Sequence, residues 1–198
     1  MLRYLSGLQV PLTFLTATLS LDSEEALRRT WRRSFHVFRS SINLPNLELV
    51  ISARANLQTL STAITPFITS RGDVDRAIIY LFTRESVSLV TQFLEKDHGT
   101  EIFAKFTGGM DHNQRKYWMT EWISGRRPVM IATSAFSLGI NYPTVRLVIT
   151  FGLPYSLDEY VQQIGRAGRD GKRSKAILYA LEREDNSNAS KDMVEFSL

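Results

Sequence analysis

The chain has 198 residues, of which 43% are hydrophobic and 22% are charged, a balance that excludes disordered and collagen-like proteins. The formal charge is +4 at pH 7, a mild excess that fits a polyanionic partner without requiring one. The chain has no cysteine, which excludes disulfides and thiolate zinc sites, and its longest apolar run, at 77–82, is too short to span a membrane.

The first 40 residues are predicted to be the end of a preceding domain and a linking helix. A strand is predicted over 12–15, and Asp22, with Glu25 three positions later, predicts a capped helix start. This helix has a basic face, with aromatic residues on its other side. A solvated amphipathic helix is the favoured explanation, and a patch for DNA phosphates is the alternative. The residues concerned are Arg28, Arg29, Arg32, Arg33 and Arg39, opposite Trp31 and Phe35.

From residue 47 onward, short apolar runs alternate with helical patterns, which predicts βαβ units and an α/β fold with a parallel sheet. Several runs lack polar alternation, as expected when helices cover both faces of the sheet. The predicted strands are 47–53, 77–82, 102–106, 129–132, 145–151 and 176–181.

Four helices are predicted between these strands. One covers 56–68, with Pro66 disturbing its last turn, and another covers 85–96. Asp111 with Gln114, and Ser156 with Glu159, predict two further capped starts. The compact domain is predicted at 41–182 and begins with a turn-rich joint at 41–46, before the first strand of the sheet. Residues 183–198 form a polar tail that we expect to be disordered.

The densest functional signal is the segment QQIGRAGRDG at 162–171. Arg166 and Arg169 are three positions apart, so on a helical turn they would project from one side, beside the small Gly165 and Gly168. Two guanidinium groups next to bare backbone suit a triphosphate. The alternative is a helix that ends in glycine and whose arginines are only solvated.

A second segment, 130–154, follows a predicted strand. That strand would deliver Thr133 and Ser134 to the carboxyl edge of the sheet, where open α/β folds bind ligands. Gly139 permits a tight turn, and Asn141 offers an amide to a sugar hydroxyl. A strand-to-helix connection with polar caps explains the same residues equally well.

Together, the two segments resemble the helicase C-terminal domain of superfamily-two motors, and most closely the RecQ-like DNA helicases. AFSLGIN, P-x-V-R-x-V-I, LP-x-S-x-x-x-Y and QQIGRAGRDG are similar, in this order, to that family's fifth and sixth motifs. AIIYLFTRES at 77–86 resembles the fourth motif, and Thr16, Ala17 and Thr18 resemble the third. DEAD-box RNA helicases usually have a histidine where this chain has Gln162.

The resemblance implies a RecA-like parallel sheet with helices on both faces, and the use of ATP with Mg²⁺. It implies that Arg169 is the arginine finger, that Arg166 assists it, and that Gln162 couples nucleotide to DNA. Asn141, Gly139 and Gly165 would lie at the nucleotide. The phosphate backbone of single-stranded DNA would contact Thr133, Ser134, Thr83 and Arg84.

Two signatures of a complete motor are missing from the sequence. A phosphate-binding loop needs G-x-x-x-x-G-K-[ST], but the only Gly-Lys pair, Gly171 and Lys172, is followed by Arg173. No apolar strand ends in Asp-Glu to hold magnesium, because Asp158 and Glu159 lie at a predicted helix start. We therefore expect no metal site in the chain and no ATP hydrolysis by the chain alone.

The resulting hypothesis is the second motor domain of an ATP-dependent RecQ-like DNA helicase, for which the family implies 3′–5′ unwinding. Its partners would be single-stranded DNA and a first RecA-like motor domain, in cis or in trans, and it would not act in a membrane. The family implies a nuclear location in a eukaryote and a cytoplasmic one otherwise, without secretion. Two alternatives stay open: a non-catalytic module that binds nucleic acid or a partner, and half of an RNA helicase.

Overall fold

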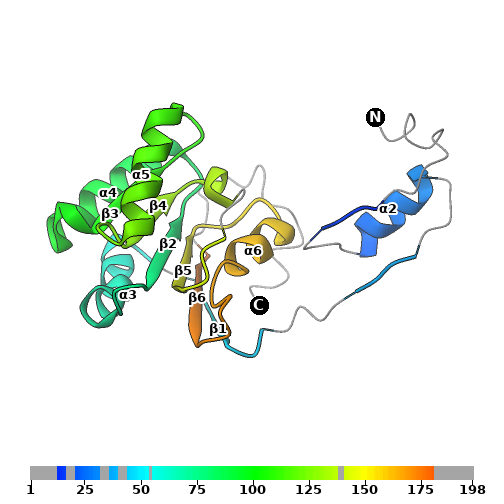
Figure 1. Cartoon of the computed structure of the whole chain (residues 1–198), viewed down its shortest axis with the longest axis horizontal. Coiled ribbons are helices and arrows are strands. Elements are labelled where there is room, and N and C mark those ends of the chain that lie inside the picture. The colour runs from blue at the N-terminus through cyan, green and yellow to red at the C-terminus, as the bar shows by residue number, and fades with distance from the viewer. Residues whose placement is uncertain are drawn as a thin grey trace. The chain divides into compact units, whose positions relative to one another are not determined.

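The computed structural model describes residues 13–16, 21–31, 36–39, 44–53, 55–137 and 141–180 (Figure 1). The chain divides into two compact units, residues 1–44 and 45–198. Within the described ranges, no helix is long and apolar enough to cross a membrane.

The first unit contains helix α2 (Leu21–Trp31). The strand predicted at 12–15 is wrong for its described part: residues 13–16 have no regular structure, since no described segment pairs with them. Asp22 is not the cap residue, because the helix begins one residue earlier. It lies in the first turn, where its negative charge favours the positive end of the helix dipole.

The predicted basic face of α2 is largely ion-paired. Arg28 and Arg29 contact Glu24 and Glu25 one turn earlier, and Arg39 also contacts Glu24. On the other side Trp31 is buried, with Phe14 edge-on at 5.2 Å between ring centroids. These contacts favour the amphipathic-helix interpretation for the described residues, whereas Arg32, Arg33 and Phe35 lie outside them.

The second unit is built on one six-stranded, entirely parallel sheet with the order β1-β6-β5-β2-β4-β3. This confirms the predicted fold class. The strands are β1 (Leu47–Ser52), β2 (Arg76–Tyr80), β3 (Phe103–Phe106), β4 (Val129–Ala132), β5 (Val145–Phe151) and β6 (Ser174–Tyr179).

Helices cover both faces of the sheet (Figure 1). Alternate residues of β2 show the division, since Ile79 packs with Leu60 and Val90 on one face, and Ile78 packs with Trp122 on the other. Burial on both faces explains why the strands lack polar alternation. The first face is covered by α3 (Leu57–Ser70) and α4 (Arg84–His98), and the second by α5 (His112–Ser124), α6 (Leu157–Ile164) and the short η2 (Ser134–Ser137).

Two predicted helix caps are confirmed. Asp111 Oδ1 accepts a hydrogen bond from the Gln114 N–H at 2.9 Å, and Ser156 Oγ accepts one from the Glu159 N–H at 3.1 Å. Both side chains satisfy N–H groups that the first helical turn leaves without partners. These caps begin α5 and α6.

Several predicted boundaries differ from the structure. The prediction for 77–82 begins one residue late and ends two late, because β2 runs from Arg76 to Tyr80. Residue 53 lies beyond the end of β1, Ile102 belongs to a 3₁₀ turn, η1 (Thr100–Ile102), and residue 181 lies outside the described ranges.

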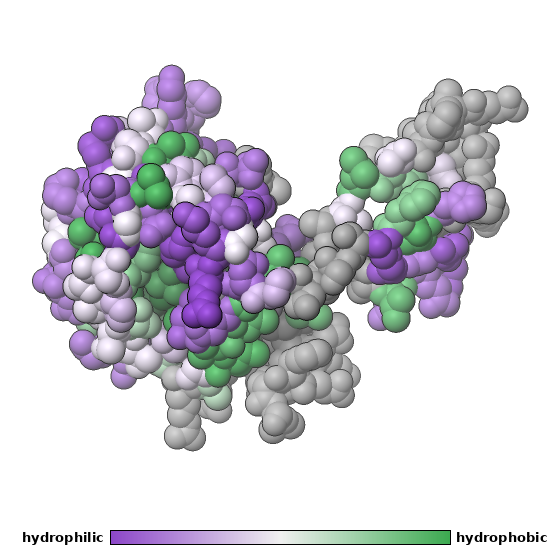
Figure 2. Space-filling model, turned by 60° about the horizontal axis from the view of Figure 1, so that its bottom comes forward, coloured by the Kyte–Doolittle hydropathy of each residue, from purple (hydrophilic) through white to green (hydrophobic). Residues whose placement is uncertain are grey.

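Pro66 does not end α3, which continues to Ser70. Proline inside a helix removes one backbone hydrogen bond and crowds the carbonyl four residues earlier. Burial of Ile64 and Phe67 in the core favours the helix on both sides of Pro66. The face of the sheet unit that Figure 2 shows is mostly hydrophilic, with hydrophobic side chains exposed in patches.

Candidate functional site

The predicted site residues lie at two ends of the parallel strands. Thr83, Arg84, Thr133 and Ser134 follow the carboxyl ends of β2 and β4. Asn141 precedes the amino end of β5, and the segment 165–170 precedes the amino end of β6. Gly139 lies outside the described residues.

A hollow of about 520 Å³ at the carboxyl ends of β2 and β4 brings together all four residues predicted to contact nucleic acid. They come from two segments about 50 residues apart in the chain. We call this surface the strand-end hollow. It is lined by Phe82, Thr83, Arg84, Glu85, Gly108, Thr133, Ser134, Ala135 and Tyr155.

The four predicted residues are not equally available to a ligand. Thr83 caps α4, and its Oγ1 accepts a hydrogen bond from the Ser86 N–H at 3.0 Å. Thr133 is only 8% exposed, and its N–H donates to the Phe106 carbonyl. Arg84 and Ser134 are exposed at the hollow. The accessible chemistry is therefore one guanidinium, one hydroxyl and the N-terminal end of α4.

Arg84 lies against the backbone of Gly109. A Cβ atom at Gly109 would be 2.3 Å from Arg84 Nη1 and 2.6 Å from Cζ, which is too close for either atom to stay in place. The adjacent Gly108 lines the hollow, and its carbonyl accepts a hydrogen bond from Arg115 Nη2 at 2.6 Å. Sequence reasoning missed this role, although the adjacent glycines in the segment FTGGM, residues 106–110, were a signal for it.

The second group surrounds Arg169. The prediction that Arg166 and Arg169 share a helical turn is wrong, because α6 ends at Ile164 and residues 165–170 form successive turns. Gly168 lies within these turns and has φ +61°, a left-handed conformation that side chains disfavour.

Two contacts orient the Arg169 guanidinium. Its Nη1 donates to Asn141 Oδ1 at 2.9 Å, and its Nε donates to the Gly165 carbonyl at 3.1 Å. The structure therefore joins Arg169, Asn141 and Gly165, which the sequence predicted at one nucleotide site. Gln162 is exposed on α6, whereas its neighbour Gln163 is buried and accepts a hydrogen bond from Thr150.

Positive charge is concentrated at this second group. Burial first, and then the charge of Arg166, lower the pKa of Arg169, although arginine stays protonated at neutral pH. A phosphate placed between these groups would relieve their repulsion. Guanidinium groups of this kind suit an anionic phosphate. In the described ranges, no group of three or more acidic or histidine side chains could hold a metal ion.

The turns at 165–170 are held by residues that sequence reasoning did not assign to the site. Asn46 Nδ2 donates to the carbonyls of Gly168 at 2.8 Å and Lys172 at 2.9 Å. Arg146 contacts both Asp170 and Asp75. Asn46 was read only as part of a turn-rich joint, because its partners lie more than 120 residues further along the chain.

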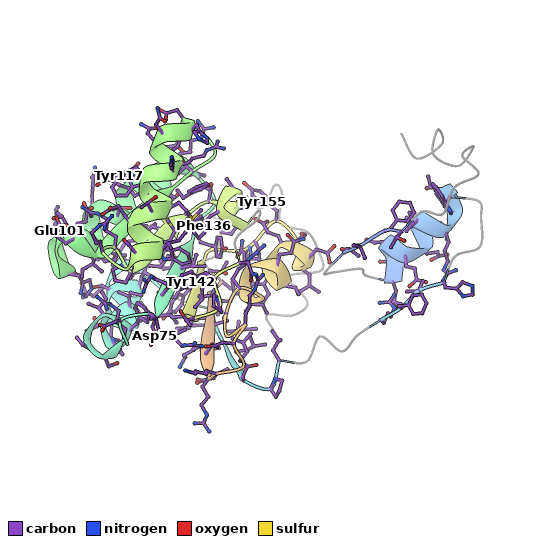
Figure 3. The ribbon with its side chains drawn as sticks, in the orientation of Figure 1. Asp75, Glu101, Tyr117, Phe136, Tyr142 and Tyr155 are labelled. Atoms are coloured by element: carbon purple, nitrogen blue, oxygen red, sulfur yellow. The ribbon has the colours of Figure 1, made fainter. Side chains whose placement is uncertain are left out.

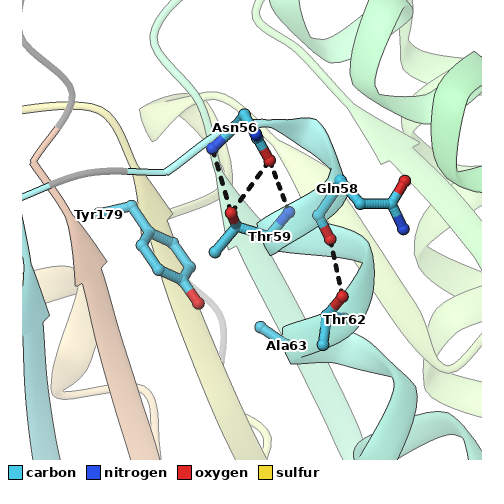
Figure 4. A pocket seen from close by; sticks show the side chains of 6 residues that line it. All are labelled: Asn56, Gln58, Thr59, Thr62, Ala63 and Tyr179. Carbon is cyan, nitrogen blue, oxygen red and sulfur yellow. Dashed lines mark hydrogen bonds between the residues drawn. The ribbon is translucent and has the colours of Figure 1, made fainter.

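A separate hollow of about 450 Å³ lies at the start of α3 (Figure 4). Asn56 and Thr59 cap the helix there, since Asn56 Oδ1 accepts a hydrogen bond from the Thr59 N–H at 2.8 Å. None of the predicted site residues lines this hollow. Asn56 and Thr59 serve the helix cap and Thr62 Oγ1 donates to the Gln58 carbonyl within the helix, so we assign this hollow no ligand.

The family model of the helicase conserved C-terminal domain matches residues 55–171. This range includes every residue that lines the strand-end hollow, and also Asn141, Gly165, Arg166 and Arg169. The chain belongs to the helicase conserved C-terminal domain family. It is RecQ-like within that family, which confirms the resemblance seen in the sequence.

Two relatives carry the RecQ-like assignment. The chain is 34% identical over 171 residues to the ATP-dependent DNA helicase Q-like 4B of Arabidopsis thaliana, covering 86% of this chain and 14% of the relative. It is 30% identical over 179 residues to the ATP-dependent DNA helicase RecQ of Synechocystis, covering 88% and 36%. The chain therefore spans only a minor part of each relative.

A solved structure shows the same fold. S. cerevisiae Dbp5 bound to RNA and ADP BeF3 matches with a TM-score of 0.68 and 18% identity, covering 85% of this chain and 44% of that one. The sheet is accordingly the RecA-like sheet of a helicase C-terminal domain.

Proposed function

We propose that this helicase C-terminal domain is the second motor domain of an ATP-dependent RecQ-like DNA helicase. In this proposal it holds single-stranded DNA at the strand-end hollow and supplies Arg169 to the nucleotide. The observation that carries the proposal is the hollow itself, where four residues predicted from two distant segments line one surface.

The strand-end hollow has the chemistry of a phosphate contact. Arg84 offers a guanidinium, Ser134 offers a hydroxyl, and the start of α4 presents backbone N–H groups and the positive end of a helix dipole. Glu85 lies in the same wall and repels phosphate. With few cations and one opposing carboxylate, binding by this chain should be weak and salt-dependent.

The nucleotide side of the proposal rests on the Arg169 group. Arg166 and Arg169 would face the phosphates of ATP, with Asn141 and Gly165 orienting Arg169 as the arginine finger. Gly139 and Gln162 would complete this side. ATP with Mg²⁺ would be the substrate, and its hydrolysis drives such motors. The phosphate loop and the magnesium ligands would come from a first motor domain, in cis or in trans.

Fluorescence anisotropy with a labelled oligothymidylate tests the DNA contact. We expect Arg84→Ala to weaken binding and to reduce the slope of log affinity against log salt by about 0.7, the value for one phosphate contact on a single strand. Lys96→Ala, an exposed cation near the other end of α4, is the matched control and should change both much less. Equal effects of the two substitutions, or tight binding at high salt, would contradict the proposal.

The alternative is a non-catalytic module that binds nucleic acid. The absence of a phosphate-binding loop from the sequence favours it. Both functions predict that Arg84→Ala weakens DNA binding. Only the motor-domain function predicts that Arg169→Ala lowers ATP hydrolysis, because only a motor domain needs an arginine finger.

A further inference from the structure

Tyr155 forms an aromatic part of the strand-end hollow. It lies between β5 and α6 and is 54% exposed. Figure 3 shows it near η2, the short helix that carries Ser134, and well separated from Tyr117 on α5. The hollow therefore combines a cationic and hydroxyl-bearing part, Arg84 and Ser134, with an exposed aromatic ring.

The Tyr155 ring is held in position by a series of contacts. It meets the Phe82 ring edge-on, with centroids 5.5 Å apart and planes at 86°. The Phe82 ring in turn packs against the backbone of Gly152, because a Cβ atom at Gly152 would be only 2.6 Å from Phe82 Cε2. Gly152 has φ +107°, a conformation that side chains disfavour. The Tyr155 N–H donates to Glu159 Oε2 at 3.1 Å. A ring fixed in this way loses little conformational entropy when a ligand stacks on it.

We infer that Tyr155 is a stacking platform for one unpaired base of the strand whose phosphates contact Arg84 and Ser134. This inference rests on the proposed function and deepens it by assigning a base contact to the same hollow. A nucleotide has an anionic phosphate and a flat aromatic base, which matches the two chemistries present.

The contact would select single strands without selecting sequence. Every base has a π face, so stacking on tyrosine tolerates all bases. A base inside a duplex already has neighbours on both faces and is not available to the ring. Tyr155 would therefore give this surface a preference for unpaired nucleic acid that phosphate contacts alone cannot give.

The test compares an oligothymidylate with an abasic oligomer that has the same sugar-phosphate backbone, using the full chain. We expect Tyr155→Ala to weaken oligothymidylate binding about 5- to 150-fold, the fold-change that base–aromatic stacking corresponds to. The same variant should bind the abasic oligomer like the parent chain, and the slope of log affinity against log salt should not change, because the proposed Tyr155 contact is to a base and not to a phosphate. Tyr155→Phe keeps the ring and should bind like the parent chain.

Tyr117→Ala is the matched control, since Tyr117 is 52% exposed and does not line the hollow. Thermal unfolding of each variant separates loss of fold from loss of contact. If Arg84→Ala weakens binding and Tyr155→Ala does not, the stacking inference is wrong and the proposed function stands. If the chain binds no single strand at all, both are overturned.

Discussion

The position of Arg84 depends on the absence of a side chain at Gly109. A methyl group there would overlap the guanidinium, and the overlapping atoms are the far end of a flexible side chain rather than backbone. The side chain can therefore move away at little cost in folding free energy. The Arg84 guanidinium would then leave its position at the strand-end hollow.

We predict that Gly109→Ala weakens single-strand binding toward the level of Arg84→Ala and changes the free energy of unfolding by less than about 0.5 kcal/mol. The control is Gly109→Ala combined with Arg84→Ala, where the added methyl group has no guanidinium to displace and should weaken binding no further than Arg84→Ala alone. Anisotropy titrations and urea unfolding of both variants measure these effects. Parent-like binding by Gly109→Ala would show that Arg84 does not depend on Gly109.

At the scale of elements, the turns before β6 are held by ion pairs from β5. Arg146 Nη1 donates to Asp170 Oδ1 at 3.0 Å, and Arg146 Nε donates to Asp75 Oδ1 at 3.1 Å. The hydrogen bonds from Arg146 hold the pKa of Asp170 below its ordinary value of 3.8. Because the folded chain binds this proton less readily than the unfolded chain, the contribution to stability exists above pH 3.8 and disappears as the pH falls through the folded value.

We therefore predict that Asp170→Asn destabilises the chain at pH 7, and that the difference from the parent chain shrinks as the pH falls below about 4. Thermal unfolding at several pH values measures it. Asp73→Asn, an exposed aspartate in the loop before β2, is the control and should show a smaller difference at pH 7. A difference for Asp170→Asn that stays constant with pH would contradict the ion-pair explanation.

Local patterns predicted the elements well, because burial on both faces and helix capping depend on residues that are neighbours in the sequence. Asp111 with Gln114 is an example, since both partners lie within one helical turn. The turns at 165–170 were missed because their conformation depends on Gly168 and on Asn46, far away in the sequence. The motifs were visible in the sequence, whereas the contacts of their residues with Gly109, Phe82 and Asn46 needed the tertiary structure.

At the scale of the whole molecule, both hydrophobic clusters of the sheet are formed by residues of the second unit alone. We predict that a fragment of residues 45–198 folds cooperatively and keeps the unfolding midpoint of the sheet unit in the full chain. Circular dichroism during heating measures both. A fragment that stays unfolded would show that residues 1–44 contribute to the core.

Hydrolysis in trans tests the central claim, that this domain completes a motor. The chain is mixed with a RecQ-like first motor domain that carries a phosphate-binding loop, and phosphate release is measured with and without single-stranded DNA. We predict DNA-stimulated hydrolysis that Arg169→Ala lowers by about 10³- to 10⁵-fold, or to the background of the assay.

In the same assay, Arg169→Lys should fail nearly as badly, because lysine lacks the planar fork that can contact Asn141, Gly165 and a phosphate together. Arg173→Ala, an exposed arginine just beyond the turns, is the control and should hydrolyse ATP like the parent pair. Equal hydrolysis with and without Arg169 would contradict the motor-domain account and favour the non-catalytic binding module.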